Sequence, residues 1–402
     1  MRLETVANTQ VLYEKNPSRI INIQILTDIG SSDEGKEEYG VAHFLEHMFF
    51  KGTSTRNAKR INRDADLIGA KLNAWTWHDH TNYHISVLQE NFEKGFELLS
   101  DIYLNATFPQ DEFEKERTVI LSEMRRYDDD PGSYLSDRAV EKFCENGLAH
   151  KVIGTENSVK SLTRDTLMQF KNRFYGGDNV LLSIVGDVEW DTVKHVIGKY
   201  FKNHSCERPS RLATSQYRQG FFELKKAEIQ ESQYQLLYPA LPYKHPKAAI
   251  QGLMVSVLGG NASALLFERI REELGLCYGI YSRVYHFEAF NFVEISTGCS
   301  EKDLGTLHGE VLQIIDKFKK ELIDEERLEM VKASILSSFY MGLESSSGLN
   351  SFLAMSYLHG ETGEFVKNRI REIKAVTRED ILQLAEETFS AHPFHAQLIA
   401  EK

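Results

Sequence analysis

The chain has 402 residues, of which 42% are hydrophobic and 8 are proline, a composition typical of globular domains and not of disordered or low-complexity segments. Asp and Glu outnumber Lys and Arg by 59 to 47, which gives a formal net charge of −12. Because an acidic body repels phosphate, and because no basic stripe with interleaved aromatic residues occurs, the composition argues against nucleic acid as a partner.

The N-terminal residues 1–14 alternate apolar with charged and polar residues. They lack the apolar core of a signal peptide and the arginine-rich pattern of a transit peptide, and no stretch approaches the roughly 18 uninterrupted apolar residues of a membrane span. We therefore expect a cytoplasmic protein, or an already processed mature chain, with no membrane partner. The cysteines are scattered without a C-x-x-C pair, which indicates neither a disulfide framework nor a thiolate zinc site.

An internal repeat divides the chain into two similar halves. Thr163 begins a helical pattern that leads into an apolar strand at 180–186, and Thr377 begins the same pattern at an offset of 377 − 163 = 214. A second match, between the segments that begin at Ile120 and Ile335, has an offset of 335 − 120 = 215. Two matches at nearly one offset indicate a duplication.

Strand-like alternation opens each half, at 21–25 and at 234–238, and amphipathic helical patterns follow it. Strands and helices mixed without strict alternation favour an α+β fold, in which each of two duplicated domains is a β-sheet with helices packed mainly on one face. The sequence predicts an N-terminal domain at 1–205, a linker at 206–220 rich in Ser, Arg, Thr and Gln, and a C-terminal domain at 221–402.

The strongest local signal for chemistry is the H-x-x-E-H pattern formed by His43, Glu46 and His47. On a helix, residues at i and i+4 lie on one face about 6 Å apart, so both imidazoles can share a metal ion. Glu46 projects near the same face, beside a metal-bound water. Catalytic zinc sites use three protein ligands and leave a position for water, so a third ligand is required. Two helix histidines without a metal remain the alternative.

The segment 43–53, in which Gly52 and Thr53 follow an aromatic residue and a lysine, resembles the metal-site helix of the pitrilysin and insulysin family of inverted-zincin metallopeptidases. It is most similar to the mitochondrial processing peptidase branch. The resemblance implies one Zn²⁺ per chain, with Glu123 as the third ligand at 123 − 47 = 76 residues after the second histidine.

A second carboxylate that the family places upstream of this ligand falls on Glu116. Glu116 and Glu123 are seven residues apart (123 − 116), which is two helical turns, so they share a helix face. A carboxylate there can accept the spare N–H of a ligating histidine and fix its orientation. A solvated helix charge is the alternative for Glu116.

Asn73 and Ala74 match the central pair of the family's edge strand, which implies that they bind an extended substrate by β-augmentation. An ordinary strand is the alternative. His78, His80 and His84 form a rival cluster, because even spacing on a strand places them on one face. They lack a carboxylate base, and His80 to His84 spans about 13 Å along a strand, too far for one ion without a bend.

The repeat confines the metal to the first half. At the offset of 215, Glu123 aligns with Ser338 and Glu116 with Val331, and the second half contains no H-x-x-E-H pattern. The acidic run 128–130 is a candidate for attracting basic residues of a substrate, with a solvated helix end as the more ordinary interpretation.

The second half instead carries Arg271 and Tyr278, which resemble the family's arginine and tyrosine pair around a Gly-Leu turn. Arg269 is a rival for the arginine. The resemblance implies that both side chains donate to the scissile carbonyl, whose oxygen gains negative charge during hydrolysis. A surface ion pair and a half-buried tyrosine are the alternative.

The resemblance implies a zinc-dependent endopeptidase that hydrolyses peptides or unfolded, presequence-like segments in a closed chamber, with Glu46 activating a zinc-bound water. In this family two chains of such length close as a clamshell. One chain carries both motifs here, so a homodimer is expected, and a heterodimer with a related chain is the alternative. The competing function is a catalytically silent or latent peptide-binding or structural subunit of the same fold.

Overall fold

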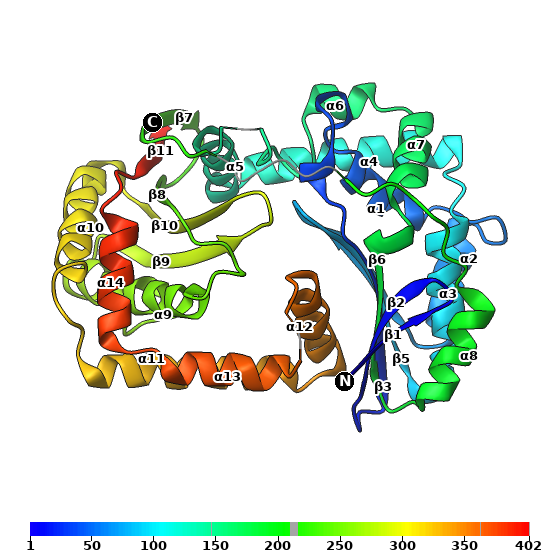
Figure 1. Cartoon of the computed structure of the whole chain (residues 1–402). Coiled ribbons are helices and arrows are strands. Elements are labelled where there is room, and N and C mark those ends of the chain that lie inside the picture. Colours follow the sequence, from blue (N-terminus) through cyan, green and yellow to red (C-terminus); the bar gives the residue numbers. More distant parts are fainter. Residues whose placement is uncertain (146, 210–215, 362, 402) are drawn as a thin grey trace. The chain divides into compact units, whose positions relative to one another are not determined.

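The structure is a computed structural model that describes residues 1–145, 147–209, 216–361 and 363–401. The chain forms two compact units, each built from one β-sheet and several helices (Figure 1). Unit 1 comprises the described residues within 1–125, 150–212 and 341–361, and unit 2 comprises those within 126–149, 213–340 and 362–402.

Unit 1 contains a six-stranded sheet in the order β1-β2-β6-β3-β5-β4, in which β2 and β6 are parallel and the other neighbours are antiparallel. Its strands are β1 Arg2–Val6, β2 Thr9–Lys15, β3 Ile20–Thr27, β4 Lys71–Thr76, β5 Thr81–Leu88 and β6 Val180–Gly186. Its helices are α1 Val41–Phe49, α2 Ala58–Leu67, α3 Phe92–Asn105, α6 Glu156–Ser161, α7 Arg164–Phe174, α8 Trp190–Tyr200 and α12 Ser346–Leu358, together with most of α4 Gln110–Asp129.

The apolar core of unit 1 lies on one face of this sheet. Ile23, Tyr83 and Ile184 are fully buried there and belong to one cluster with Phe44 and Phe49 of α1. This packing follows from the period of two in a β-strand, which directs alternate side chains to one face. The core therefore fixes which side of α1 is buried and which side is left for other contacts.

The opposite face of the unit 1 sheet is polar and is covered by α12 (Figure 1). The fully buried Asn350 donates hydrogen bonds to the Asn22 side chain at 2.7 Å and to the Ser183 carbonyl at 3.0 Å. Gln24 of β3 donates to the Ser351 hydroxyl at 3.0 Å. Because strand alternation places polar residues on this face, α12 is held by hydrogen bonds more than by apolar packing.

Unit 2 contains a five-stranded sheet in the order β7-β11-β8-β10-β9. Its strands are β7 Gly220–Ala227, β8 Ser232–Pro239, β9 Cys277–His286, β10 Asn291–Cys299 and β11 Phe394–Glu401. Its helices are α5 Pro131–Phe143, α9 Ala248–Gly259, α10 Leu304–Phe318, α13 Phe365–Ala375 and α14 Arg378–Phe389, most of α11 Glu325–Leu343, and the π-helix η5 Phe267–Glu273. Among the described residues, no helix has the length and hydropathy needed to cross a bilayer.

The predicted duplication and the predicted α+β fold are both confirmed. In chain order, β2, β3, α1, β4, β5, α3, α4, α5, α6, α7 and β6 correspond to β7, β8, α9, β9, β10, α10, α11, α12, α13, α14 and β11. The sheet orders β2-β6-β3-β5-β4 and β7-β11-β8-β10-β9 correspond as well. Thr377 caps α14 with the capping box that the sequence indicates.

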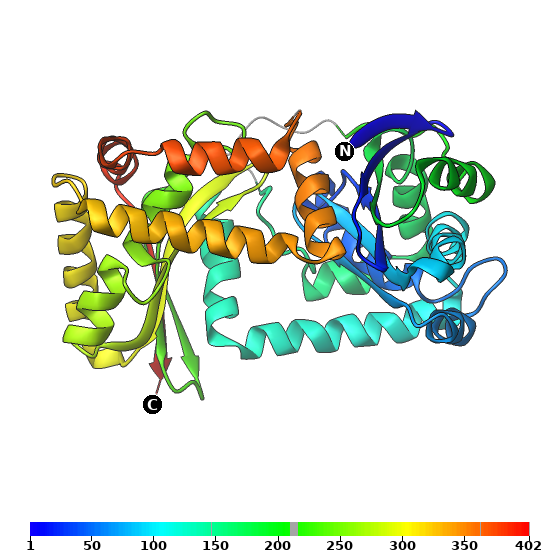
Figure 2. The same ribbon diagram turned by 90° about the horizontal axis from the view of Figure 1, so that it is seen from below.

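The two units differ from the contiguous domains 1–205 and 221–402, because two helices lie on the sheet of the other half. α5 packs on β8 and β11, where Phe143 meets Phe394 at 6.0 Å between ring centroids, and α12 packs on β3 and β6. Each follows a long helix, α4 or α11, of 20 or 19 residues; a helix of this length extends about 30 Å. Figure 2 shows α12 beside the sheet of unit 1 in a second view. The predicted linker 206–220 lies partly outside the described residues.

Candidate metal centre

The start of α1 is fixed by a buried carboxylate that the sequence analysis missed. Glu34 accepts hydrogen bonds from the backbone N–H groups of Gly40 and Ala42, both at 2.8 Å, and lies 2.9 Å from Nε2 of His150. These bonds satisfy two of the N–H groups that a helix start leaves unpaired. Gly40 has a φ of +92°, and a Cβ on it would lie 2.8 Å from the Ile153 carbonyl oxygen. This position therefore requires glycine.

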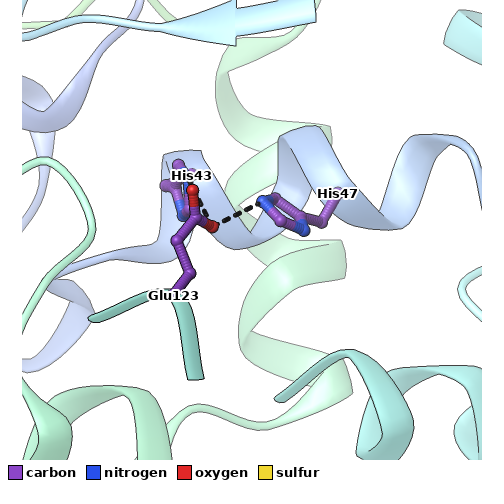
Figure 3. Close-up of side chains that lie close together, drawn as sticks. All are labelled: His43, His47 and Glu123. Atoms are coloured by element: carbon purple, nitrogen blue, oxygen red, sulfur yellow. Dashed lines mark ion pairs between the residues drawn. The ribbon is translucent and has the colours of Figure 1, made fainter. Parts of the chain in front are cut away.

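Two histidines and a glutamate converge from α1 and α4 (Figure 3). One ligand atom of each of His43, His47 and Glu123 lies within 4.8 Å of the others. Oε2 of Glu123 is 3.8 Å from Nε2 of His43 and 3.5 Å from Nε2 of His47. The three side chains named from the sequence as metal ligands are thus brought together. Within the described part of the chain, no other group of three such residues meets the same criterion.

Glu116, also on α4, contacts the His47 ring on the nitrogen that does not face Glu123. Its Oε1 is 2.8 Å from Nδ1 of His47, and its Oε2 is 2.6 Å from Nζ of Lys51. Burial would raise the pKa of Glu116, but the hydrogen bonds with His47 and Lys51 outweigh it and lower the pKa. An ionised Glu116 accepts the Nδ1 proton of His47 and so turns its Nε2 toward Glu123.

Burial and neighbouring charges shift the pKa values of the two histidines in opposite directions. Burial would lower the pKa of His47, but hydrogen bonds to Glu116 and Glu123 outweigh it and raise the pKa to about 9. Burial and the neighbouring His47 lower the pKa of His43 to about 4. Two imidazole nitrogens and one carboxylate oxygen are a donor set that zinc takes in catalytic sites. The residues present therefore fit a zinc ion.

Glu46 lies on the same side of α1 as the two histidines and contacts the neighbouring strand. Its Oε2 accepts a hydrogen bond from the Thr76 hydroxyl of β4 at 2.7 Å. Burial raises the pKa of Glu46, and the Thr76 hydrogen bond and His47 oppose that rise. No role for Thr76 was predicted from the sequence, although strand alternation puts Thr76 on the same face of β4 as the buried Ala74.

β4 is the edge strand of the unit 1 sheet. Among the described strands it pairs with β5 alone, so its outer edge is unpaired. Ala74 is buried against the core, whereas Asn73 is exposed and points to the opposite face of the sheet. The edge can therefore offer backbone groups to an extended chain, while the two side chains point to opposite faces.

The rival histidine cluster is not formed. His78 and His80 lie in the connection between β4 and β5, and only His84 lies in a strand, so the three do not share one strand face. His78 Nδ1 is 3.0 Å from the Ser31 hydroxyl, and His80 Nδ1 is 2.7 Å from Oδ1 of Asp79.

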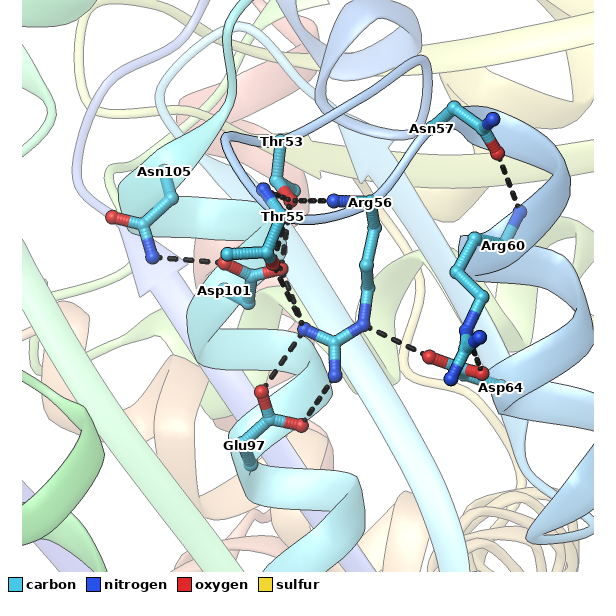
Figure 4. Close-up of polar contacts among 9 residues, drawn as sticks. All are labelled: Thr53, Thr55, Arg56, Asn57, Arg60, Asp64, Glu97, Asp101 and Asn105. Carbon is cyan, nitrogen blue, oxygen red and sulfur yellow. Dashed lines mark hydrogen bonds and ion pairs between the residues drawn. The ribbon is translucent and has the colours of Figure 1, made fainter.

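The segment after α1 is held by a polar network around Arg56 (Figure 4). The Arg56 guanidinium donates to Asp101 at 2.7 Å, to Asp64 at 3.0 Å and to both oxygens of Glu97 at 2.8 and 3.0 Å. The Thr53 hydroxyl donates to the same Asp101 oxygen at 2.8 Å. The network connects the loop after α1 to α2 and α3. The sequence showed only the Gly-Thr resemblance in this loop.

In unit 2, the ion pairs distinguish Arg271 from its rival Arg269. Arg269 forms ion pairs with Glu310 at 2.9 Å and Glu273 at 2.8 Å. Among the described residues, Arg271 forms an ion pair with the adjacent Glu272 alone and lies 5.5 Å from the centroid of the Phe267 ring, and Tyr278 is 86% exposed. Arg271 lies in η5, and π-helical turns are rare and often occur at functional sites. Arg271 is thus less engaged than its rival.

The acidic run 128–130 is largely used in local structure. Asp128 lies 3.1 Å from the Arg138 guanidinium. Asp130 caps α5 by accepting the Ser133 N–H at 2.8 Å. Asp128 and Asp130 therefore each have a structural role that requires no substrate. On α11, Val331 is buried and Ser338 is exposed, and neither is a residue type that binds zinc in proteins.

Known proteins resemble this chain over nearly its whole length. The family model Insulinase (Peptidase family M16) matches residues 10–156, and the model Peptidase M16 inactive domain matches residues 161–335. An uncharacterized zinc protease of Mycobacterium leprae is 30% identical, covering 94% of this chain and 86% of the relative, and the uncharacterized zinc protease YmxG of Bacillus subtilis is 29% identical, covering 95% and 93%.

Solved structures share the fold. A protease from Helicobacter pylori has a TM-score of 0.92 at 22% identity and covers 99% of both chains. A peptidase M16 inactive domain from Pseudomonas fluorescens has a TM-score of 0.90 at 17% identity and covers 100% of this chain and 99% of the other. The resemblance stated from the sequence motifs is confirmed, and the chain belongs to peptidase family M16, the insulinase family of zinc proteases.

Proposed function

We propose that this chain is a zinc-dependent endopeptidase that hydrolyses peptides or unfolded segments. The observation that supports this most is the convergence of His43, His47 and Glu123, with Glu46 beside them on α1. These three side chains would hold one zinc ion. When bound, the ion supplies a Lewis acid that polarises the scissile carbonyl and makes water a stronger nucleophile at neutral pH.

The chain's own residues supply the remaining chemistry. Glu46 takes a proton from the attacking water and later passes it to the leaving amine. Its side chain is partly buried beside the ligands, a location suited to both transfers. Glu116 keeps the His47 ring in place through the 2.8 Å contact at Nδ1.

The substrate is proposed to bind as an added strand along the free edge of β4. Backbone hydrogen bonds to such an edge form with any sequence, which suits a peptidase of broad choice. We assign Arg271 and Tyr278 to the substrate carbonyl, because a guanidinium and a phenol donate to an oxygen that gains negative charge. A closed chamber formed by two copies of the chain is part of the proposal.

The test combines metal analysis with peptide cleavage. The purified protein should contain one zinc ion per chain and cleave an unfolded protein, and a chelator should abolish cleavage. Glu46→Gln should retain zinc and lose about 10²- to 10⁴-fold in kcat, whereas Glu90→Gln, at an exposed position, should behave as the unmodified protein.

The outcomes separate the proposal from its competitor. A protein that binds peptides without zinc and without cleavage would be the silent or structural subunit. Undiminished turnover by Glu46→Gln would remove Glu46 as the base. Cleavage that survives complete removal of zinc would contradict metal-dependent hydrolysis.

A further inference from the structure

We propose that Thr76 is a positioning residue that holds the Glu46 carboxylate in one orientation for proton transfer. This inference rests on the proposed function, because it assumes that Glu46 is the base. Thr76 is the last residue of β4, and Glu46 lies on α1, so the contact joins two elements of unit 1.

The two oxygens of Glu46 have different surroundings. Oε2 accepts the hydrogen bond from the Thr76 hydroxyl at 2.7 Å. Within the described part of the chain, no hydrogen bond or ion pair is found for Oε1. A glutamate side chain has three rotatable bonds, so a single fixed oxygen greatly narrows the positions that the other can take. One oxygen is therefore anchored, and the other is available to the water.

The strand segment that carries Thr76 is fixed by its neighbours. Thr76 pairs across the sheet with Thr81 of β5, which is fully buried and donates to the Ile29 carbonyl at 2.9 Å. The preceding inward-facing residue, Ala74, is packed in the core. Because a β-branched side chain is also restricted at χ1, the donor has a defined position relative to the strand.

The placement of this donor on β4 has a consequence for catalysis. The free edge of the same strand is the edge proposed to receive the peptide. A strand that aligns the peptide backbone and also orients the base sets the position of the base relative to the scissile bond. Catalysis is sensitive to such positions, since a displacement of about 1 Å can cost about 10²-fold in rate.

The experiment compares Thr76→Val, which keeps the shape but removes the donor, with Thr76→Ser, which keeps the donor. Thr76→Val should lower kcat by about 10²-fold, with KM changed by less than about 3-fold, and Thr76→Ser should recover most of kcat. Zinc content and melting temperature should equal those of the unmodified protein in both variants. A purely structural role would instead change melting temperature or KM and would not be rescued by serine.

A second measurement does not depend on activity. Crystal structures of both variants, with and without zinc, should show the Glu46 carboxylate rotated in Thr76→Val and unchanged in Thr76→Ser. Where Thr76→Val does not fold, Thr76→Ala is compared in the same way. An unchanged Glu46 rotamer together with an unchanged kcat overturns the inference. If no form of the zinc-loaded protein cleaves peptides, the proposed function fails, and the rotamer alone decides whether Thr76 positions Glu46.

Discussion

The helices α1 and α9 occupy the same place in the element order of their units, but they carry different kinds of side chain. α1 leaves His43, Glu46 and His47 partly exposed on one side, whereas the partly exposed residues of α9 are alanine, isoleucine, glycine and serine. The fully buried polar residue of α9, Gln251, accepts the Leu241 N–H at 2.8 Å and needs no ligand. The fold therefore accepts a purely structural helix at this position. The proposed metal chemistry therefore depends on a few side chains and not on the architecture.

The long helices α4 and α11 show the same contrast. α4 carries the carboxylates Glu116 and Glu123, and α11 carries Val331 and Ser338 at the aligned positions. Val331 is 4% exposed and belongs to the apolar core of unit 2. The helix of one copy thus contributes an apolar side chain to a core, and the helix of the other brings two carboxylates to α1. Substitutions that act on one copy and not on its counterpart test this division.

The largest effect is expected for Glu123→Ala. Removal of one of three protein ligands should lower zinc affinity by more than about 10²-fold, because even a residue that only supports a ligand is worth 10- to 100-fold, and should abolish peptide cleavage. The matched control is Ser338→Ala on α11, which should leave both unchanged. Chelator competition and a peptide assay measure the two quantities. Equal behaviour of the two variants would contradict the assignment of Glu123 as a ligand.

A smaller loss of zinc affinity is expected for Glu116→Gln. The amide keeps the shape but cannot hold His47 through an ionised acceptor, so zinc affinity should fall by about 10- to 100-fold. Glu112→Gln on the same helix, where the side chain forms an ion pair with the exposed Lys115, should have no effect. The same competition assay serves both. An affinity that does not change in Glu116→Gln would show that the contact at 2.8 Å does not support the ligand.

Arg56→Met tests whether the loop after α1 depends on its polar network. Loss of several hydrogen bonds to charged partners should lower the free energy of unfolding of unit 1 by about 1.5–3 kcal/mol. The Arg56 side chain is only 17% exposed, whereas that of Arg60, which pairs with the same Asp64, is 60% exposed. Arg60→Met should therefore cost about 0–1 kcal/mol. Urea denaturation measures the loss in free energy of unfolding for both variants. An equal loss in the two variants would contradict a special role for Arg56.

The smallest effect is a pH dependence in the same network. Burial would raise the pKa of Asp101, but hydrogen bonds from Asn105, Arg56 and Thr53 outweigh it and hold the pKa below its ordinary value of 3.8. Ionised Asp101 therefore stabilises the fold above pH 3.8, and that contribution is lost as the pH falls through the lowered pKa. The gap in unfolding midpoint between the unmodified protein and Asp101→Asn should narrow over this range. A gap that is constant with pH would contradict the ionised form.

Much of the fold follows from local sequence patterns. The apolar run 180–186 is β6 with the same bounds, and the cap at Thr377 begins α14, because both depend on residues close in the chain. His43, His47 and Glu123 were also found from spacing on two helices and a family resemblance. Periodicity and spacing predict the local features without knowledge of the tertiary structure, whereas Glu123 was identified from the family resemblance.

The features that the sequence did not reveal depend on long-range contacts. Nothing near Glu34 indicates that its carboxylate binds the first turn of α1, and nothing near Thr76 indicates Glu46, 30 residues away. In the same way, the pattern of α5 predicts an amphipathic helix but not which sheet it covers. Polar side chains pair where the tertiary fold brings them together. The periodicity of a segment does not reveal which distant residue will be its partner.

The most direct test of the account is a crystal structure of the zinc-loaded protein, with anomalous data at the zinc absorption edge. The account predicts one anomalous peak in each chain, bound by His43, His47 and Glu123, with the Thr76 hydroxyl still bound to Glu46. A peak at other residues, a second peak in unit 2, or no peak in protein shown to be folded would contradict it.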